Sequence, residues 1–206
     1  MRSATSDDVF VNCPFDTEYH ATFEAIVFAI FACGFRARSV RELDDHGENR
    51  FEKIFNIIGQ CRYGIHDLSR TELDADTQLP RFNMPLELGC FLAAKRFGDE
   101  EQRRKRTLIF DVEQYRYQKF ISDLSGMDIA AHAGQPVTAV ARVRDWLANV
   151  SRRRIASAGR IVSAYERFAK SLTERCEAEA FDRDRIPYVD FERMVAEWLL
   201  EAPEDE

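Results

Sequence analysis

Residues 80–89 read PRFNMPLELG, and Glu87 in this stretch is a carboxylate close to an expected helix start. If Asn83 or Met84 caps that helix, Pro85 takes an early position that needs no N–H, and Glu87 lies in the first turn. The helix dipole there favours the ionised carboxylate, so we expect Glu87 to stay charged near neutral pH. Such an anion can act as a nucleophile or stabilise a sugar cation, and it is poorly suited to donate a proton. The alternative is a capping carboxylate that contributes about 1 kcal/mol or less.

Gly89 follows two residues later, inside the same expected helix. Glycine in a helix costs roughly 1 kcal/mol relative to alanine, so we expect a close approach by another group to that turn. The approaching group is either a neighbouring strand or a ligand beside Glu87. Asn83 and Arg81 lie next to this turn, and the polar loop at 71–78 could close over it as a lid.

A second group of polar residues ends the segment RYGIHDLSR at 62–70, which has the pattern of a strand. Asp67 lies at the strand end, where a carboxylate can accept hydrogen bonds from ribose hydroxyls, while Ser69 and Arg70 could reach phosphate oxygens. In the alternative interpretation, Asp67 and Ser69 bond only to backbone groups of the turn. We expect His66 to be an internal histidine with its bonds satisfied, because no second histidine lies at a metal-binding spacing.

The elements that must position these residues are strands and helices that alternate along the chain. Expected strands lie within 9–15, 35–40, 62–68, 106–111 and, most weakly, 126–134, with helices at 18–35, 50–61, 83–98 and from Pro136 to about 150. Helices between strands imply parallel strand–helix–strand units with right-handed crossovers. The pattern predicts an α/β fold, a flavodoxin-like three-layer sandwich with a mainly parallel sheet, over residues 1–150.

Residues 151–206 have a different character. A long helical pattern runs to a break near Ile186-Pro187, a last helix covers 190–201, and an acidic tail closes the sequence. We expect this helical extension to cover the sheet domain or to form a contact between two copies of the chain.

The amino-acid composition makes several classes of ligand and partner unlikely. The formal net charge of −7 and pI near 5.3 make nucleic acid an unlikely ligand, and we expect the basic clusters at 103–106 and 152–154 to be solvated surface. Five cysteines form no CxxC motif, so neither a disulfide framework nor a metal site is expected. No segment reaches the roughly 18 apolar residues of a membrane helix or resembles a signal peptide. We therefore expect a cytoplasmic protein that does not bind membranes.

Three segments together resemble a known group of proteins: VFVNCPF before a helix, DLS at a strand end, and RFNMPLELGCFLAAKRFG. Over about residues 8–112 the chain is similar to the TIR-like predicted nucleotide-binding proteins of bacteria and to the nucleoside 2-deoxyribosyltransferases. The TIR-like group shows an asparagine, three residues, then Glu-Leu-Gly, a pattern that Asn83, Glu87, Leu88 and Gly89 match. The transferases usually carry an Asp-Gly-Thr element where residues 81–85 read RFNMP here.

The resemblance implies an N-glycosidase that cleaves NAD or a related nucleotide, often as a toxic effector in defence against phage, with Glu87 as the catalytic group. Breaking the N-glycosidic bond builds positive charge on the sugar, and a preorganised anion stabilises this charge. Judged by position in the chain, an amide or carboxylate of the first loop would line the pocket. An aromatic ring would stack on the base, and an arginine would bind phosphate. The expected substrate-binding residues are Asn12, Phe15, Asp16, Tyr19, Asp67, Ser69, Arg70, Arg81 and Asn83.

Two alternatives stay open at this stage. The same pocket could sense a nucleotide without turnover, or the chain could be a TIR-type assembly module in which Glu87 is only a cap. In the enzyme and the sensor, NAD or a nucleotide is the substrate or ligand, and no separate cofactor is expected. Partners are a small nucleotide and a second copy of the chain, bound through the C-terminal helices.

Overall fold

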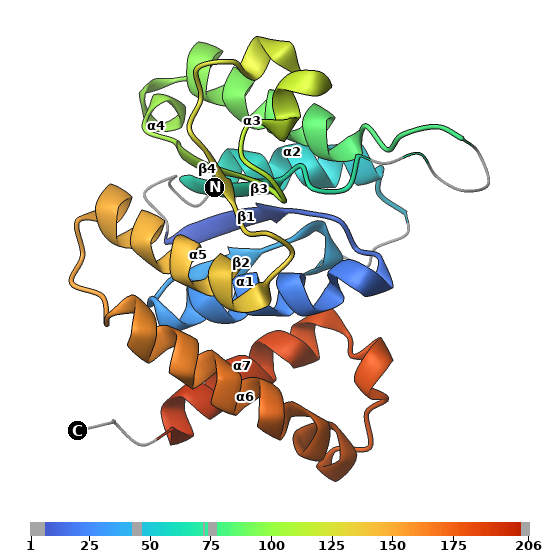
Figure 1. Ribbon diagram of the computed structural model, residues 1–206, viewed down its shortest axis with the longest axis vertical. Helices are drawn as coiled ribbons and strands as arrows, with labels where there is room; N and C mark the ends of the chain where they lie inside the picture. The colour runs from blue at the N-terminus through green and yellow to red at the C-terminus, as the bar shows by residue number, and fades with distance from the viewer. Residues whose placement is uncertain (1–6, 43–46, 72, 74–77, 203–206) are drawn as a thin grey trace.

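The computed structural model describes residues 7–42, 47–71, 73 and 78–202. At its centre lies one sheet of five parallel strands in the order β2-β1-β3-β4-β5 (Figure 1). The strands are β1 (Asp8–Asn12), β2 (Arg36–Arg38), β3 (Tyr63–Asp67), β4 (Arg106–Asp111) and β5 (Ile129–Ala131). The winding direction reverses between β1 and β3, the point at which doubly wound sheets generally bind ligands. The prediction of a flavodoxin-like α/β fold is confirmed.

Helices cover both faces of the sheet, as Figure 1 shows. One face carries α1 (His20–Ala32) and α5 (Pro136–Ser151), and the other carries α2 (Arg50–Gln60) and α3 (Asn83–Phe97), followed by the short α4 (Glu100–Arg103). Short 3-10 turns are η1 (Thr17–Tyr19), η2 (Val40–Glu42), η3 (Arg116–Lys119), η4 (Ser122–Leu124) and η5 (Arg183–Arg185).

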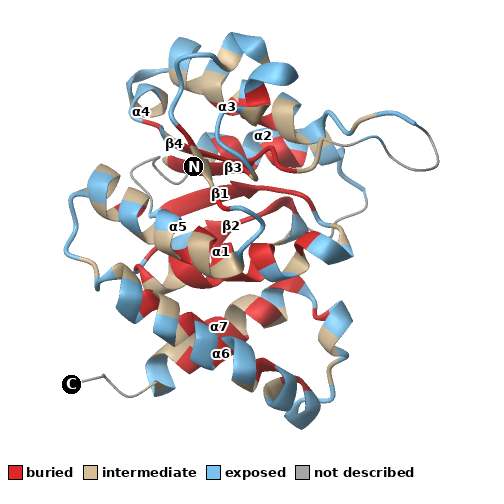
Figure 2. Ribbon diagram, viewed as in Figure 1, coloured by how far each residue is buried: buried red, intermediate tan, exposed pale blue. Residues whose placement is uncertain are grey.

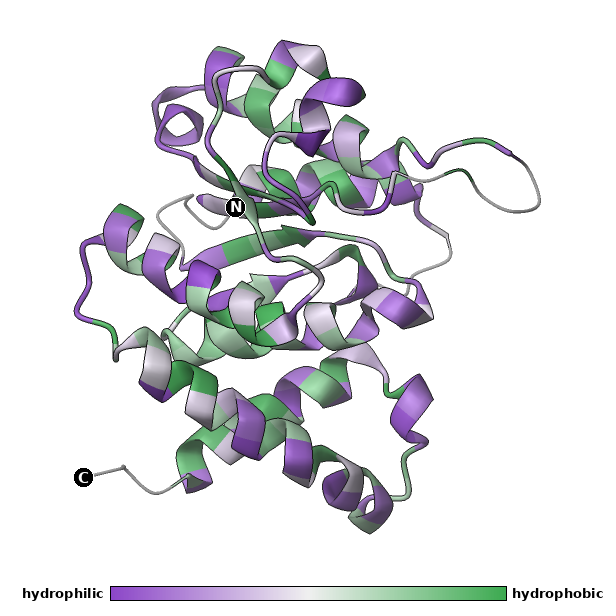
Figure 3. Cartoon of the chain, in the orientation of Figure 1, coloured by the Kyte–Doolittle hydropathy of each residue, from purple (hydrophilic) through white to green (hydrophobic). Residues whose placement is uncertain are grey.

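The C-terminal helices α6 (Ala158–Ala178) and α7 (Tyr188–Glu201) add a further layer on the outer side of α1 (Figures 1 and 2). Hydrophobic and hydrophilic segments alternate along α6 in Figure 3, and its apolar stripe packs inward, with the rings of Phe28 and Phe168 stacked at 5.1 Å. Helix α1 is apolar on all sides because it lies between the sheet and this layer. The extension therefore covers the sheet domain, and self-association through it stays a prediction.

Element boundaries follow the sequence closely. The strand at 106–111 has the predicted limits, and the weakest one, within 126–134, forms the three-residue edge strand β5. The last helix begins at Tyr188, two residues before its predicted start at 190, because Pro187 precedes it as the N-cap. Among the described residues, no helix is long and apolar enough to cross a membrane. All five cysteines are free, and the described part of the chain holds no cluster of metal-ligating side chains.

Lys105 corrects the expectation that the cluster at 103–106 is solvated. Its side chain is fully buried, and the ammonium group donates to the backbone carbonyls of Ile58, at 2.6 Å, and Cys61 at the end of α2. It also lies 4.6 Å from the ring centre of Phe91, and burial lowers its pKa to about 8. A lysine at this place gives carbonyls at the C-terminal end of the helix a further donor. The other cluster, at 152–154, is exposed as predicted.

Candidate functional site

Two adjoining pockets lie where loops and helices meet beyond β1 and β3. The arginine pocket has a volume of about 360 Å³ and is lined by Pro14, Phe15, Asp16, Thr17, Arg50, Arg70, Arg81, Asn83 and Met84. The Glu87 pocket has a volume of about 200 Å³ and is lined by Asn49, Arg50, Phe51, Ile54, Asn83, Leu86 and Glu87. Arg50 and Asn83 line both, so the two pockets form one site.

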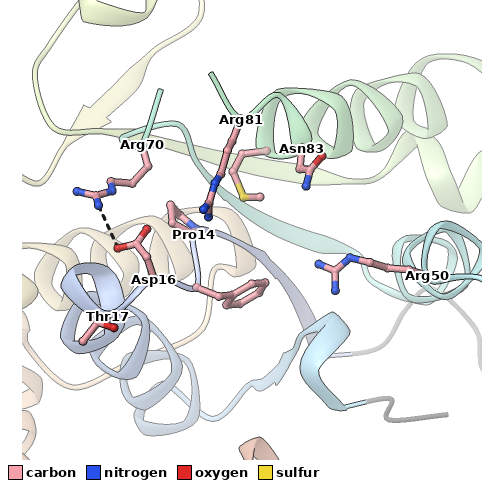
Figure 4. A pocket seen from close by; sticks show the side chains of 9 residues that line it. Pro14, Asp16, Thr17, Arg50, Arg70, Arg81 and Asn83 are labelled. Atoms are coloured by element: carbon pink, nitrogen blue, oxygen red, sulfur yellow. Dashed lines mark ion pairs between the residues drawn. The ribbon is translucent and has the colours of Figure 1, made fainter. Parts of the chain in front are cut away.

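Three arginines give the first pocket its positive character. Figure 4 shows Arg50 reaching in from α2, Arg81 from the segment before α3, and Arg70 from the loop after β3. Arg70 is held by Asp16 at 3.3 Å and by Glu18 at 2.7 Å. Guanidinium groups match the geometry of phosphate oxygens, so the pocket suits an anionic group.

The N-termini of two helices add to the positive electrostatic field of the site. Asn49 caps α2, accepting a hydrogen bond from the backbone N–H of Phe51 at 2.8 Å, and it lines the Glu87 pocket. Helix α3 begins at Asn83 without a side-chain cap, and Asn83 lines both pockets. The positive ends of two helix dipoles therefore meet at the site, which favours a negative ligand.

Glu87 is buried, with 5% of its surface exposed, and faces the smaller pocket. The helix begins at Asn83, so Glu87 follows the first turn rather than lying within it, and the dipole acts on it less than expected. Burial raises its pKa to about 7, while the charge of Arg50 opposes that rise. The expectation of a fully ionised Glu87 at neutral pH is therefore wrong, since both protonation states are populated there.

Gly89 corrects a second expectation. It is exposed, and a Cβ added to it would meet no atom within 4 Å. Nothing in the structure explains this glycine. The close approach occurs instead at Gly64 of β3, where a Cβ would lie 2.7 Å from Phe91 of α3 and 2.8 Å from His66. A lone glycine inside a strand was the sequence signal for this contact.

Asp67 belongs to an internal network and lines neither pocket. It is fully buried and accepts hydrogen bonds from the Tyr19 hydroxyl at 2.5 Å and the backbone N–H of Ser69 at 2.8 Å. His132, at the end of β5, lies 2.9 Å from it. Burial alone would raise the pKa of Asp67, but the bonds from His132, Ser69 and Tyr19 lower it below its usual value. Asp67 therefore bonds to its own turn, as the alternative interpretation expected, but it also bonds to two distant side chains that this interpretation did not include.

The network also removes two other expected ligand contacts. The Tyr19 ring is buried with its hydroxyl bonded to Asp67, so of the two rings expected to stack on a base only Phe15, which is 37% exposed, lines one of the two pockets. The side chain of Ser69 is buried as well and reaches neither pocket. Of the expected substrate-binding residues, the structure brings together Phe15, Asp16, Arg70, Arg81 and Asn83.

Asn12 positions α3 from inside the protein. Its side-chain amide donates to the backbone carbonyl of Met84 at 2.9 Å and lies 3.0 Å from Nδ1 of His66. Burial, with the charge of Lys105, lowers the pKa of His66 to about 3, so this imidazole is neutral and accepts from Asn12. The prediction that His66 is internal is confirmed, but the expectation that its bonds are satisfied is wrong, since its buried Nε2 has no hydrogen-bond partner among the described residues. Asn12 supports the pocket wall rather than lining it.

Two residues at or beside the site were not predicted from the sequence. Arg50 lines both pockets, but its position directly after the N-cap of α2 gave no signal of its own. Arg116 pairs with buried Asp111 at 2.6 Å and donates to the carbonyls of Leu68 and Ser69, which braces the loop after β3. Residues 72 and 74–77 of the expected lid lie outside the described residues.

Comparison of this chain with family models, with curated proteins and with solved structures finds no match. The resemblance to TIR-like and deoxyribosyltransferase proteins therefore stays a prediction.

Proposed function

We propose that this chain is a nucleotide-binding N-glycosidase that cleaves NAD or a related nucleotide, with Glu87 as the group that acts on the sugar. One observation carries the proposal: a buried carboxylate and a pocket with three arginines adjoin at the reversal point of the sheet. The carboxylate suits a centre that develops positive charge, and the arginines suit the phosphate of the same molecule.

In the proposed reaction the bond between the base nitrogen and C1′ breaks, and its electron pair leaves with the base. The ionised form of Glu87 stabilises the positive charge left on the sugar, either through space or by bonding to C1′. Water then adds to C1′ of the sugar, displacing Glu87 where it has bonded there. The proton that the water loses goes to solvent or to the released base. Burial strengthens the electrostatic effect because little water screens it.

The test is incubation of the purified chain with a panel of dinucleotides, nucleotides and nucleosides, followed by mass spectrometry. The proposal expects nicotinamide or a free base together with the matching sugar product. Intact substrates throughout, at protein concentrations that span possible self-association, would overturn it.

A nucleotide sensor is the second candidate, and one observation favours it. Asp67 and Tyr19, which were expected at the sugar and the base, lie inside the protein, so cationic groups dominate the polar lining. Charge alone is enough for binding without turnover. Calorimetric binding of a nucleotide with no product by mass spectrometry would identify a sensor. A role in defence against phage follows only from the resemblance and stays a prediction.

A further inference from the structure

The Glu87 pocket is too small to hold a whole nucleotide. Its volume is about 200 Å³, whereas ligand pockets generally measure about 300–1,000 Å³. The arginine pocket next to it adds about 360 Å³ and shares Arg50 and Asn83 with it. A ligand whose reacting part lies beside Glu87 must therefore extend past Arg50 into the arginine pocket.

The two ends of this site differ in chemistry. Beside Glu87 the walls are largely apolar, formed by Phe51, Ile54 and Leu86, and suit a flat ring. The arginine pocket has three guanidinium groups against the carboxylate of Asp16 and suits phosphate. The order along the ligand is therefore base and sugar first, then phosphate.

Arg50 stands at the junction of these two ends. It is the one arginine that lines both described pockets, and the Asn49 cap fixes the start of the helix that carries it. Figure 4 shows its side chain extended toward the space between α2 and the segment before α3. Its charge also opposes the rise in the pKa of Glu87 that burial causes.

On the basis of the proposed glycosidase function, we propose that Arg50 makes the site specific for nucleotides over nucleosides. It binds the 5′-phosphate of the same nucleoside whose base is released, and the arginine pocket beyond it takes any further phosphate. Nucleosides without a phosphate are then weak ligands and poor substrates.

The test compares matched pairs of nucleoside and nucleoside 5′-monophosphate for adenosine, guanosine, cytidine, uridine and thymidine, together with NAD. Dissociation constants are measured by calorimetry in the Glu87→Gln background, so that turnover does not interfere. Arg50→Met, which keeps the length of the side chain, is added to that background. The matched control is Arg103→Met, which changes an exposed arginine of α4 at a different pocket. Circular dichroism checks that each variant is folded, and base release is measured separately in the wild type.

We expect the monophosphate to bind at least about tenfold more tightly than its nucleoside, and Arg50→Met to weaken monophosphate binding about 10–100-fold while nucleoside binding stays within about twofold. Arg103→Met should change neither.

Equal binding of nucleoside and monophosphate, or an equal loss for both in Arg50→Met, overturns the inference. If phosphate-dependent binding is found but no base is released, the role of Arg50 stands and the glycosidase is overturned. If no nucleotide binds, both are overturned.

Discussion

Arg50 and Glu87 line the same pocket of about 200 Å³ from two different helices, and the charge of Arg50 acts with burial to set the pKa of the glutamate. Burial disfavours the charged carboxylate, and the guanidinium partly offsets that effect. The result is a group that changes its protonation state near pH 7 inside a concave site, a property common in catalytic residues.

The first prediction concerns the dependence of base release on pH. If the ionised form of Glu87 acts, kcat/KM should rise about tenfold per pH unit below pH 7 and level off above it, because its pKa is about 7. Arg50→Met should move the midpoint to higher pH, since it removes the charge that favours ionisation. Initial rates between pH 5.5 and 8.5 measure both effects. A rate that falls as pH rises through 7 would mean that Glu87 acts as a proton donor instead.

The second prediction concerns Glu87→Gln. This variant keeps the shape of the side chain but not its charge, so base release should fall by about 10³-fold or more, while the melting temperature stays equal or rises slightly. Chromatography of the products and thermal melting monitor the two properties. Glu192→Gln on α7 is the matched control, because burial also raises the pKa of Glu192 to about 7 but it lies outside both pockets. Equal loss in both variants would indicate a general effect on the fold.

Sequence reasoning predicted the fold well because the relevant signals are local. The apolar run of β4 and the capped, amphipathic pattern of α2 each specify an element without knowledge of the rest of the chain. Once the elements alternate, the parallel sheet follows from general rules of connection.

The site was predicted only in part because its details depend on contacts between distant residues. Glu87 was placed correctly at a pocket, but the pKa of its carboxylate depends on how deeply α3 packs, which no local pattern records. Asp67 is enclosed by His132, 65 positions away. Lys105 was predicted as surface because a basic cluster shows nothing of the helix end that it caps.

The third prediction tests whether Asp67 is an internal support rather than a substrate ligand. Asp67→Asn removes a charge that accepts bonds from Tyr19, His132 and Ser69, so the free energy of unfolding should fall by about 3–5 kcal/mol. The pKa of Asp67 is lowered in the folded state, so its contribution is complete at neutral pH and is lost only as pH falls through the folded pKa. Urea unfolding at pH 7 measures the change.

Asp16→Asn provides the comparison for that experiment. Asp16 lines the arginine pocket and caps the η1 turn, a role that asparagine can also fill, so stability should change by less than about 1 kcal/mol while nucleotide binding changes. A stable Asp67→Asn variant with weakened nucleotide binding would contradict the internal role and return Asp67 to the list of ligand-binding residues.

The fourth prediction compares two glycines, Gly64 in β3 and Gly89 in α3. Gly64→Ala places a methyl group 2.7 Å from the buried Phe91 ring, so β3 and α3 must separate slightly and stability should fall by about 1–3 kcal/mol. Gly89→Ala adds a methyl group into open space on a helix and should stabilise the protein by about 0.5–1 kcal/mol. Chemical unfolding of both variants measures the difference. Because α3 carries Glu87, Gly64→Ala should also reduce base release, whereas Gly89→Ala should leave it unchanged.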